Sequence, residues 1–301
     1  MSRDKITITI EKGGSGSGHY GHAGRPGKRG GSLPSGVALS IRTGRDRASR
    51  QRLATTTAAK DKNKALLNSM RNDPIVKFGT YAEGQGVSDI YSGKLPDGTR
   101  VHVKTKSVYG ETRAEADVYE ITQMLGGEYT DLVPPTVLRE DGSSVQLWVD
   151  GYVQAGSFNV GATDRGFIPE ENNFVPEIAT NADAWSRMTA MDIVFGNTDR
   201  HLGNFMIGKD GKGLKAIDND QMFVGYEQLK FGDVLYDITF AEEQFYDMTG
   251  KFTNLGRTDF QPFIDLAQTD QFQKLLSNYS QIYQDSVYKR IDDIDNLRIL
   301  G

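Results

Sequence analysis

The sequence of 301 residues contains no cysteine. This absence excludes disulfide bonds, thiolate nucleophiles and zinc sites built on cysteine, and it agrees with a reducing compartment. Long apolar runs are also missing: no stretch approaches the roughly 18 residues of a membrane-spanning helix, and the first residues lack the apolar centre of a signal peptide. We therefore expect a cytoplasmic protein that does not insert into membranes.

Large apolar side chains are scarce in residues 1–72, where Gly, Ser and Arg dominate. Such a composition cannot offset its ordering entropy by burial, so we predict a flexible, disordered basic arm, with local order as a short strand at Ile6–Ile10 and a helix near Ala58–Met70. The arm carries 15 Lys and Arg against 4 Asp and Glu, whereas the remainder carries 20 against 36. It is either a solvated linker or a contact to nucleic acid or an acidic protein, and its single aromatic, Tyr20, weakens the nucleic-acid reading.

Alternating apolar patterns begin after the arm. Val87–Leu95 and Arg100–Lys104 flank an Asp-Gly turn, which predicts a β-hairpin. Glu111–Leu125 has apolar residues at helical spacing and ends at two glycines, and Val145–Val149 is typical of a strand. Together these elements predict a small α+β lobe over residues 73–150.

The second half, residues 151–301, is predicted to be a more helical lobe. Asn181–Phe195 has helical spacing and stops at a glycine. Met206-Ile207 and Leu214–Ile217 flank an Asp-Gly turn and predict a second hairpin. Two further helices are expected at Phe260–Leu266 and Phe272–Ile291.

Oxygen-bearing side chains cluster around this second hairpin. The run GNTDRHLGN places Asp199 five positions before Asn204, and the run AIDND places Asp218 at the end of an apolar strand. A lone Asn or Asp in a turn is usually a turn former, but three such oxygen donors in this order are the parts that hold a divalent metal against a nucleotide phosphate. The pattern predicts a phosphoryl-transfer enzyme.

Six segments in order carry a family resemblance: VHVK, RAEADVYEITQMLG, LVPPTVLRE, VQLWVDG, GNTDRHLGN and AIDND. They resemble the phosphatidylinositol 3/4-kinase-like branch of the protein-kinase-like fold, near its bacterial and phage members of the HipA and actin-fragmin-kinase types. The resemblance spans about Phe78–Phe223. It implies a two-lobed fold with ATP bound between the lobes.

The resemblance implies a role for each polar residue. Lys104 matches the strand lysine that grips the α- and β-phosphates, and Glu115 matches the helix acid that pairs with it, with Glu111 and Glu120 as rivals for that role. Asp199 matches the acid that orients or deprotonates the attacking hydroxyl.

The metal ligands implied by the resemblance are Asn204 and Asp218, which would hold Mg²⁺ or Mn²⁺. Asp220 stands where relatives have glycine and is either a second metal ligand or a stabiliser of the loop. His201 is expected to support the backbone rather than to react, whereas Arg200 is open between anchoring the loop and contacting phosphate.

Two backbone segments are expected to bind the nucleotide. Gly84, Gly86 and Ser88 lie between the first strands, where a phosphate-covering loop belongs. Gln146–Val149 would be the hinge that offers backbone groups to adenine, although Trp148 could equally be a core residue.

The segment GHYGHAGRPGKRGGS in the arm resembles a Gly-Arg-Pro-Gly segment of tailed-phage minor head proteins, which implies a phage origin, a place in the host cytoplasm or the virion, and a capsid or nucleic-acid contact through residues 1–72. The expected reaction is ATP- and Mg²⁺-dependent phosphorylation of Ser or Thr in a protein. An inositol headgroup matches poorly, since Gln221–Asp237 carries only one cation, Lys230. Two alternatives stay open: AMP transfer on the same fold, or a pseudokinase or structural phage-head component that binds nucleotide without turnover.

Overall fold

The computed structural model describes residues 60–80, 89–107, 110–155, 160–163, 166–169, 182–223 and 255–296. The chain divides into two compact units, Met1–Ala58 and Ala59–Gly301, and the described residues all lie in the second. Residues 1–59 of the predicted arm therefore lie outside the described residues. Residues 60–72 form a helix of the second unit, so this unit begins before the predicted boundary at residue 72.

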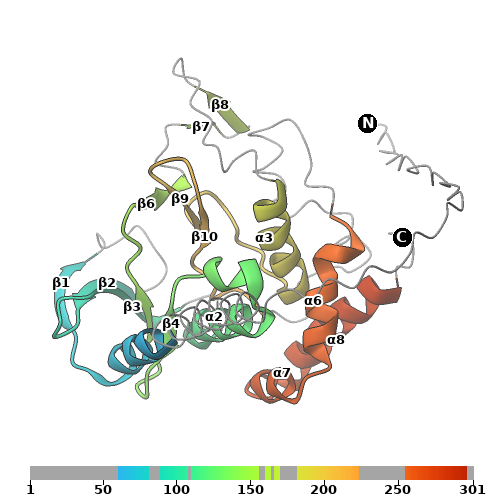
Figure 1. Ribbon diagram of the computed structural model, residues 1–301, viewed down its shortest axis with the longest axis horizontal. Coiled ribbons are helices and arrows are strands. Elements are labelled where there is room, and N and C mark those ends of the chain that lie inside the picture. Colours follow the sequence, from blue (N-terminus) through green and yellow to red (C-terminus); the bar gives the residue numbers. More distant parts are fainter. Residues whose placement is uncertain are drawn as a thin grey trace, which may run out of the picture. The chain divides into compact units, whose positions relative to one another are not determined.

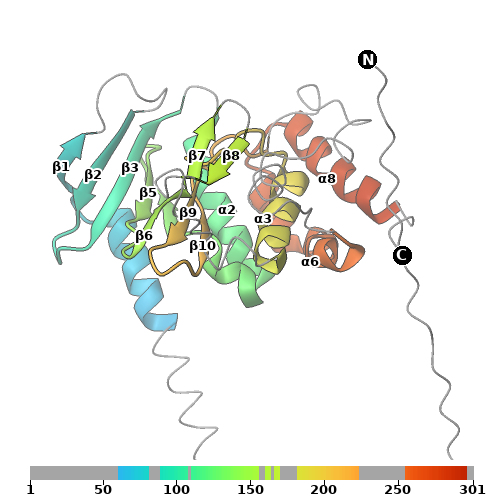
Figure 2. The ribbon, with the colours of Figure 1, turned by 90° about the horizontal axis from the view of Figure 1, so that it is seen from above.

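A five-stranded antiparallel sheet forms the first part of this unit (Figures 1 and 2). The predicted hairpin is confirmed, because the second and third strands pair from Asp89 opposite Lys106 to Lys94 opposite Arg100. Gly98 adopts a φ of 87° in the turn, a conformation that glycine accepts without steric cost. In sheet order the strands are β1 (Val76–Thr80), β2 (Asp89–Lys94), β3 (Arg100–Lys106), β5 (Ser144–Leu147) and β4 (Thr136–Leu138).

Helix α2 (Thr112–Leu125) packs against strands β4 and β5, as its apolar spacing predicts. Ala114, Val118 and Ile121 recur on one stripe of the helix and are fully buried. On the sheet, Val101 and Val103 alternate inward and enclose Met70 of the helical residues 60–72. Lys104 follows these valines, so the rigid centre of the sheet fixes its backbone.

Two smaller sheets follow. The predicted second hairpin is confirmed: β9 (Phe205–Gly208) pairs antiparallel with β10 (Leu214–Ala216), and β6 (Tyr152–Gln154) extends the sheet on the other side of β9. Strands β7 (Val160–Thr163) and β8 (Gly166–Pro169) pair with each other. A short 3₁₀ helix, η1 (Gly127–Asp131), follows α2.

The remaining helices are α3 (Ala182–Phe195), α6 (Arg257–Ala267), α7 (Asp270–Leu276) and α8 (Gln281–Asn296), and α3, α6 and α8 pack on one another (Figure 1). Trp185, Met188 and Phe195 of α3 are fully buried in the main core. None of the helices in the described ranges has the length and apolar character needed to cross a bilayer.

The helix predicted at Phe272–Ile291 is wrong in one respect, since the chain forms two helices, α7 and α8, with a break at residues 277–280. Tyr279 in the break is buried: its hydroxyl donates to Asp117 of α2 at 2.8 Å, and its ring lies 4.6 Å from that of Phe223. Ser277, Asn278 and Ser280 of the break are polar and exposed, so Tyr279 alone joins this corner to the core.

Candidate active site

Lys104 of β3 is the centre of a buried charged cluster. Its side chain is only 8% exposed. Its Nζ donates to Glu115 Oε1 at 2.7 Å, to Asp220 Oδ2 at 3.0 Å and to the carboxylate of Asp218. An ammonium group has three donors. All three are therefore used on carboxylates.

Glu115 is the acid of α2 that meets the lysine. It lies in the first turn of the helix and is buried, whereas its rivals Glu111 and Glu120 are exposed. Its second oxygen accepts a hydrogen bond from the backbone N–H of Asn219 at 3.0 Å. One carboxylate thus ties α2 both to the central strand and to the segment that carries Asp218.

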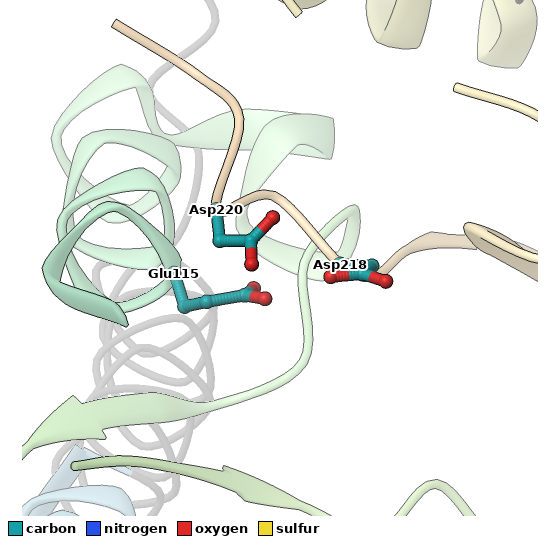
Figure 3. A group of neighbouring side chains, drawn as sticks. All are labelled: Glu115, Asp218 and Asp220. Atoms are coloured by element: carbon teal, nitrogen blue, oxygen red, sulfur yellow. The ribbon is translucent and has the colours of Figure 1, made fainter. Parts of the chain in front are cut away.

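The cluster carries more negative than positive charge. Oxygens of Glu115, Asp218 and Asp220 lie within 4.8 Å of one another, and Figure 3 shows the carboxylates of Glu115 and Asp220 turned toward each other with Asp218 beside them. Burial lowers the pKa of Lys104, but the three carboxylates outweigh it and raise this pKa overall. Burial, reinforced by the two aspartates, raises the pKa of Glu115 against the attraction of the lysine.

This donor set fits a divalent cation. Three carboxylates around one ammonium leave two negative charges uncompensated, and carboxylate oxygens are the hard ligands that Mg²⁺ and Mn²⁺ prefer. Asp218 has the accessible carboxylate of the three, because its side chain is 38% exposed whereas those of Glu115 and Asp220 are buried.

Asp199 lies in the loop between α3 and β9 and is held from three sides. Its backbone N–H donates to Asn197 Oδ1 at 2.9 Å. Its Oδ2 accepts from Gln221 Nε2 at 2.9 Å and from Asn204 Nδ2 at 3.2 Å. These contacts orient a carboxylate that remains 38% exposed, so a substrate hydroxyl can reach it.

Asn204 and Asp218 flank the same end of the β9–β10 hairpin, as its pairing predicts. Phe205 lies opposite Ala216, and the backbone N–H of Ile217 donates to the carbonyl of Asn204 at 3.1 Å. The amide nitrogen of Asn204 is used on Asp199, which leaves its amide oxygen to face a cation. Among the described residues, however, the acids gathered around Asp218 are Glu115 and Asp220.

Arg200 is a loop anchor and not a phosphate contact. It is 1% exposed and makes five hydrogen bonds within the protein. Two of them reach the carboxylate of Asp192 at 3.0 and 3.1 Å, one reaches Asn219 Oδ1 at 2.6 Å, and two reach the carbonyls of Asn204 and Ile217 at 2.5 and 2.6 Å. A guanidinium has five N–H donors, so none is left for a ligand.

Part of the chain matches a known protein family. The family model of phosphatidylinositol 3- and 4-kinase matches residues 169–280, a span that contains Asp199, Asn204 and Asp218. The described residues add the Lys104–Glu115 pair ahead of that span. This match supports a protein-kinase-like fold of the phosphatidylinositol 3/4-kinase-like branch. The sheet of β1 to β5 with α2 lies in the first predicted lobe, the N-lobe, and the matched span lies in the second, the C-lobe.

Several solved kinase structures are similar to this chain at low identity. The Helicobacter pylori proinflammatory kinase CtkA is 13% identical, with 75% of this chain and 93% of that chain covered at a TM-score of 0.48. The Golgi casein kinase is 13% identical, with coverages of 78% and 73% and a TM-score of 0.48. Its Mn/ADP-bound structure is 12% identical, with coverages of 79% and 75% and a TM-score of 0.49. A search of the curated proteins finds no match.

His201 supports the loop backbone of this kinase-like fold, as expected. Its Nδ1 accepts the backbone N–H of Gly203 at 2.9 Å, and the ring is 54% exposed. Its Nε2 lies 3.9 Å from Asp199 Oδ1, beyond hydrogen-bond distance.

The predicted hinge is only partly strand. Gln146 pairs with His102 in the sheet, and β5 ends one residue later. Trp148 is half-buried and stacks on His102 with ring centroids 4.4 Å apart and 16° between the planes, so it is not a core residue. The predicted phosphate-covering residues Gly84, Gly86 and Ser88 lie outside the described residues.

Four residues of the site were not predicted from the sequence: Asp192, Asn197, Asn219 and Gln221. Burial raises the pKa of Asp192, and the paired guanidinium of Arg200 opposes this rise. The position of Asp192 on the apolar stripe of α3 is the feature that could have marked it, because a carboxylate there must have a buried partner.

Proposed function

We propose that this chain is an ATP- and divalent-metal-dependent kinase that phosphorylates Ser or Thr of a protein. The observation that carries the proposal is the contact of Lys104 with Glu115 and Asp218, since it joins the N-lobe strand, the N-lobe helix and the C-lobe segment at one point. This is the arrangement that places a cation on the phosphates beside the metal ligands in phosphoryl transfer.

In the proposed reaction, the hydroxyl oxygen of the acceptor attacks the γ-phosphorus of ATP and the bond to the β–γ bridging oxygen breaks, so that ADP leaves. The hydroxyl proton passes to the carboxylate of Asp199, which Gln221 and Asn204 hold in place. Lys104 neutralises the α- and β-phosphates, and Asp218 with the amide oxygen of Asn204 would hold the metal. The metal supplies charge neutralisation on the phosphate oxygens when bound.

Protein Ser or Thr is preferred over an inositol lipid as acceptor on electrostatic grounds. The segment Gln221–Asp237 has a single cation, Lys230, in its sequence, whereas a phosphorylated headgroup needs several. A neutral hydroxyl side chain needs none.

The test is a radiolabel assay on the full chain with Mg²⁺ or Mn²⁺, a mixture of model protein substrates, and phosphatidylinositol vesicles as a separate arm. Label from [γ-³²P]ATP on protein Ser or Thr is expected, with no label from [α-³²P]ATP. Transfer of the α-label would establish AMP transfer instead, and lipid labelling would change the acceptor class. Nucleotide binding without either label would establish a pseudokinase.

The matched variants are Asp218→Ala and Asp293→Ala. Asp218→Ala removes the accessible carboxylate of the cluster and should lower turnover by about 10²–10³-fold or more, as loss of a preorganised charge does. Asp293 is the half-buried partner of the exposed Lys289 in α8, away from the cluster, so Asp293→Ala should leave turnover unchanged. Full activity of Asp218→Ala would refute the proposed site.

A further inference from the structure

Lys104 has no donor left for a phosphate. Its three N–H groups point to Glu115, Asp218 and Asp220, and the cluster holds two excess negative charges, with Glu115 and Asp220 buried. A nucleotide triphosphate carries several negative charges of its own. It is therefore repelled from this arrangement unless one acid is withdrawn and its charge compensated.

The two aspartates differ in their freedom to be withdrawn. The side chain of Asp218 is 38% exposed, so its carboxylate borders solvent. Asp218 can therefore turn outward to a cation.

Asp220 is fixed, in contrast. Its side chain is 7% exposed, and its carbonyl accepts the backbone N–H of Glu111, next to the start of α2, at 2.9 Å. Gly110 approaches so closely that a Cβ placed there would lie 2.0 Å from the carbonyl oxygen of Asp220. The backbone of Asp220 therefore packs tightly against the N-terminal end of α2, and its carboxylate accepts a hydrogen bond from Lys104.

We propose that Asp220 is a positioning residue that makes nucleotide binding depend on a divalent cation. It holds Lys104 in place and keeps the net charge of the cluster negative until a cation binds Asp218. Loss of the Asp218 contact then frees one N–H of Lys104 for phosphate. Asp220 itself is not a metal ligand, because it remains buried on the lysine. This inference rests on the proposed function and specifies how its site is regulated.

The test compares wild-type protein with Asp220→Asn in nucleotide binding, measured by calorimetry with the non-hydrolysable analogue AMP-PNP. The variant keeps an oxygen acceptor for Lys104 and removes one charge. In wild type, affinity should fall by about 100-fold or more when EDTA replaces Mg²⁺. In Asp220→Asn this ratio should shrink by about 10-fold or more, through tighter metal-free binding. Asp292→Asn removes one charge from an exposed position of α8 and should leave the ratio unchanged.

A second measurement separates positioning from ligation. Mn²⁺ binding without nucleotide, followed by electron paramagnetic resonance, should weaken less than about 3-fold in Asp220→Asn; a loss of 10-fold or more would make Asp220 a ligand and overturn the inference. If Asp220→Asn unfolds, Asp220→Ser provides the same comparison with a smaller neutral side chain.

Failure of the inference on Asp220 and failure of the proposed kinase function give different results. An unchanged ratio in a variant that still transfers phosphate overturns the inference alone. Cation-dependent AMP-PNP binding by a wild-type chain that transfers no phosphate overturns the kinase proposal and leaves the role of Asp220 standing. A wild-type chain that binds no nucleotide under either condition overturns both.

Discussion

Two buried charged clusters lie next to each other in this fold, and they differ in balance. Arg200 faces one carboxylate, Asp192, and fills its remaining donors with neutral oxygens, so its charge is compensated and all five N–H groups are satisfied. Lys104 faces three carboxylates. A balanced cluster needs nothing further and serves as scaffold, whereas an unbalanced one is completed only by a ligand of opposite charge.

Asn219 connects the two clusters. Its backbone N–H donates to Glu115, and its side-chain oxygen accepts from Arg200. Arg200 also donates to the carbonyl of Ile217, so its hydrogen bonds fix the residues on both sides of Asp218. The carboxylate of Asp218 itself is left free to exchange partners.

Arg200→Met should have the largest effect on stability. Removal of the guanidinium leaves Asp192 as an unpaired buried carboxylate, which should lower the free energy of unfolding by about 3–5 kcal/mol. Urea denaturation measures this loss. Arg187→Met breaks the more exposed pair with Glu128 and should cost less than about 1 kcal/mol. Equal losses in the two variants would contradict the scaffold role.

Lys104→Met tests the other cluster. Turnover should fall by about 10²–10³-fold, because the phosphates lose their buried counter-charge, and AMP-PNP affinity should fall with it. Steady-state kinetics and calorimetry measure the two effects. Lys289→Met, at an exposed pair in α8, is the control with unchanged kinetics. A Lys104→Met variant with wild-type affinity would remove the lysine from the nucleotide site.

Asp117 is a buried acid outside both clusters, and its hydrogen-bond partner, Tyr279, is neutral. Burial raises its pKa from 3.8 to about 6, although the Tyr279 hydrogen bond and Arg113 oppose the rise, while Glu111 and Glu120 add to it. Because the folded state holds this proton more tightly, stability falls as the pH rises from about 4 to about 6 and is level above.

Asp117→Asn should remove that loss and keep the acceptor for Tyr279. Its stability relative to wild type should therefore rise by roughly 2–3 kcal/mol between pH 4 and pH 7. Urea denaturation across this range measures the difference. Parallel pH profiles of the two proteins would show that Asp117 titrates normally.

Gln221→Ala gives the smallest effect. It removes one of the hydrogen bonds that orient Asp199, so turnover should fall by about 3–10-fold while the free energy of unfolding changes by less than about 1 kcal/mol. A matched Gln284→Ala, on α8, removes a similar hydrogen bond away from the site and should leave turnover unchanged. A fall of more than about 100-fold would assign Gln221 a direct role in the reaction.

Local patterns made the hairpins, α2 and α3 predictable, because each is encoded by turn residues and by apolar spacing within a short window. The contact between Lys104 and Glu115 was predictable only through a family resemblance, since nothing in either segment specifies the other. The break between α7 and α8 was missed because Tyr279 continues the helical spacing of Phe272 and Leu276 past the polar residues of the break.

The role of Arg200 could not be predicted for a related reason. Its five hydrogen bonds go to four residues in α3, the loop after it and the segment after β10. A polar residue in a turn has the same sequence appearance whether it faces water or a buried guanidinium. Only the convergence of these segments decides between the two.

Tyr279 links the corner between α7 and α8 to two parts of the chain near the Lys104 cluster. Its hydroxyl holds α2, the helix of Glu115, and its ring lies on Phe223, three residues beyond Asp220. A force or a binding event that displaces α7 or α8 must therefore disturb one of those two contacts. Displacement of the C-terminal helices is therefore transmitted through α2 to the contact between Glu115 and Lys104.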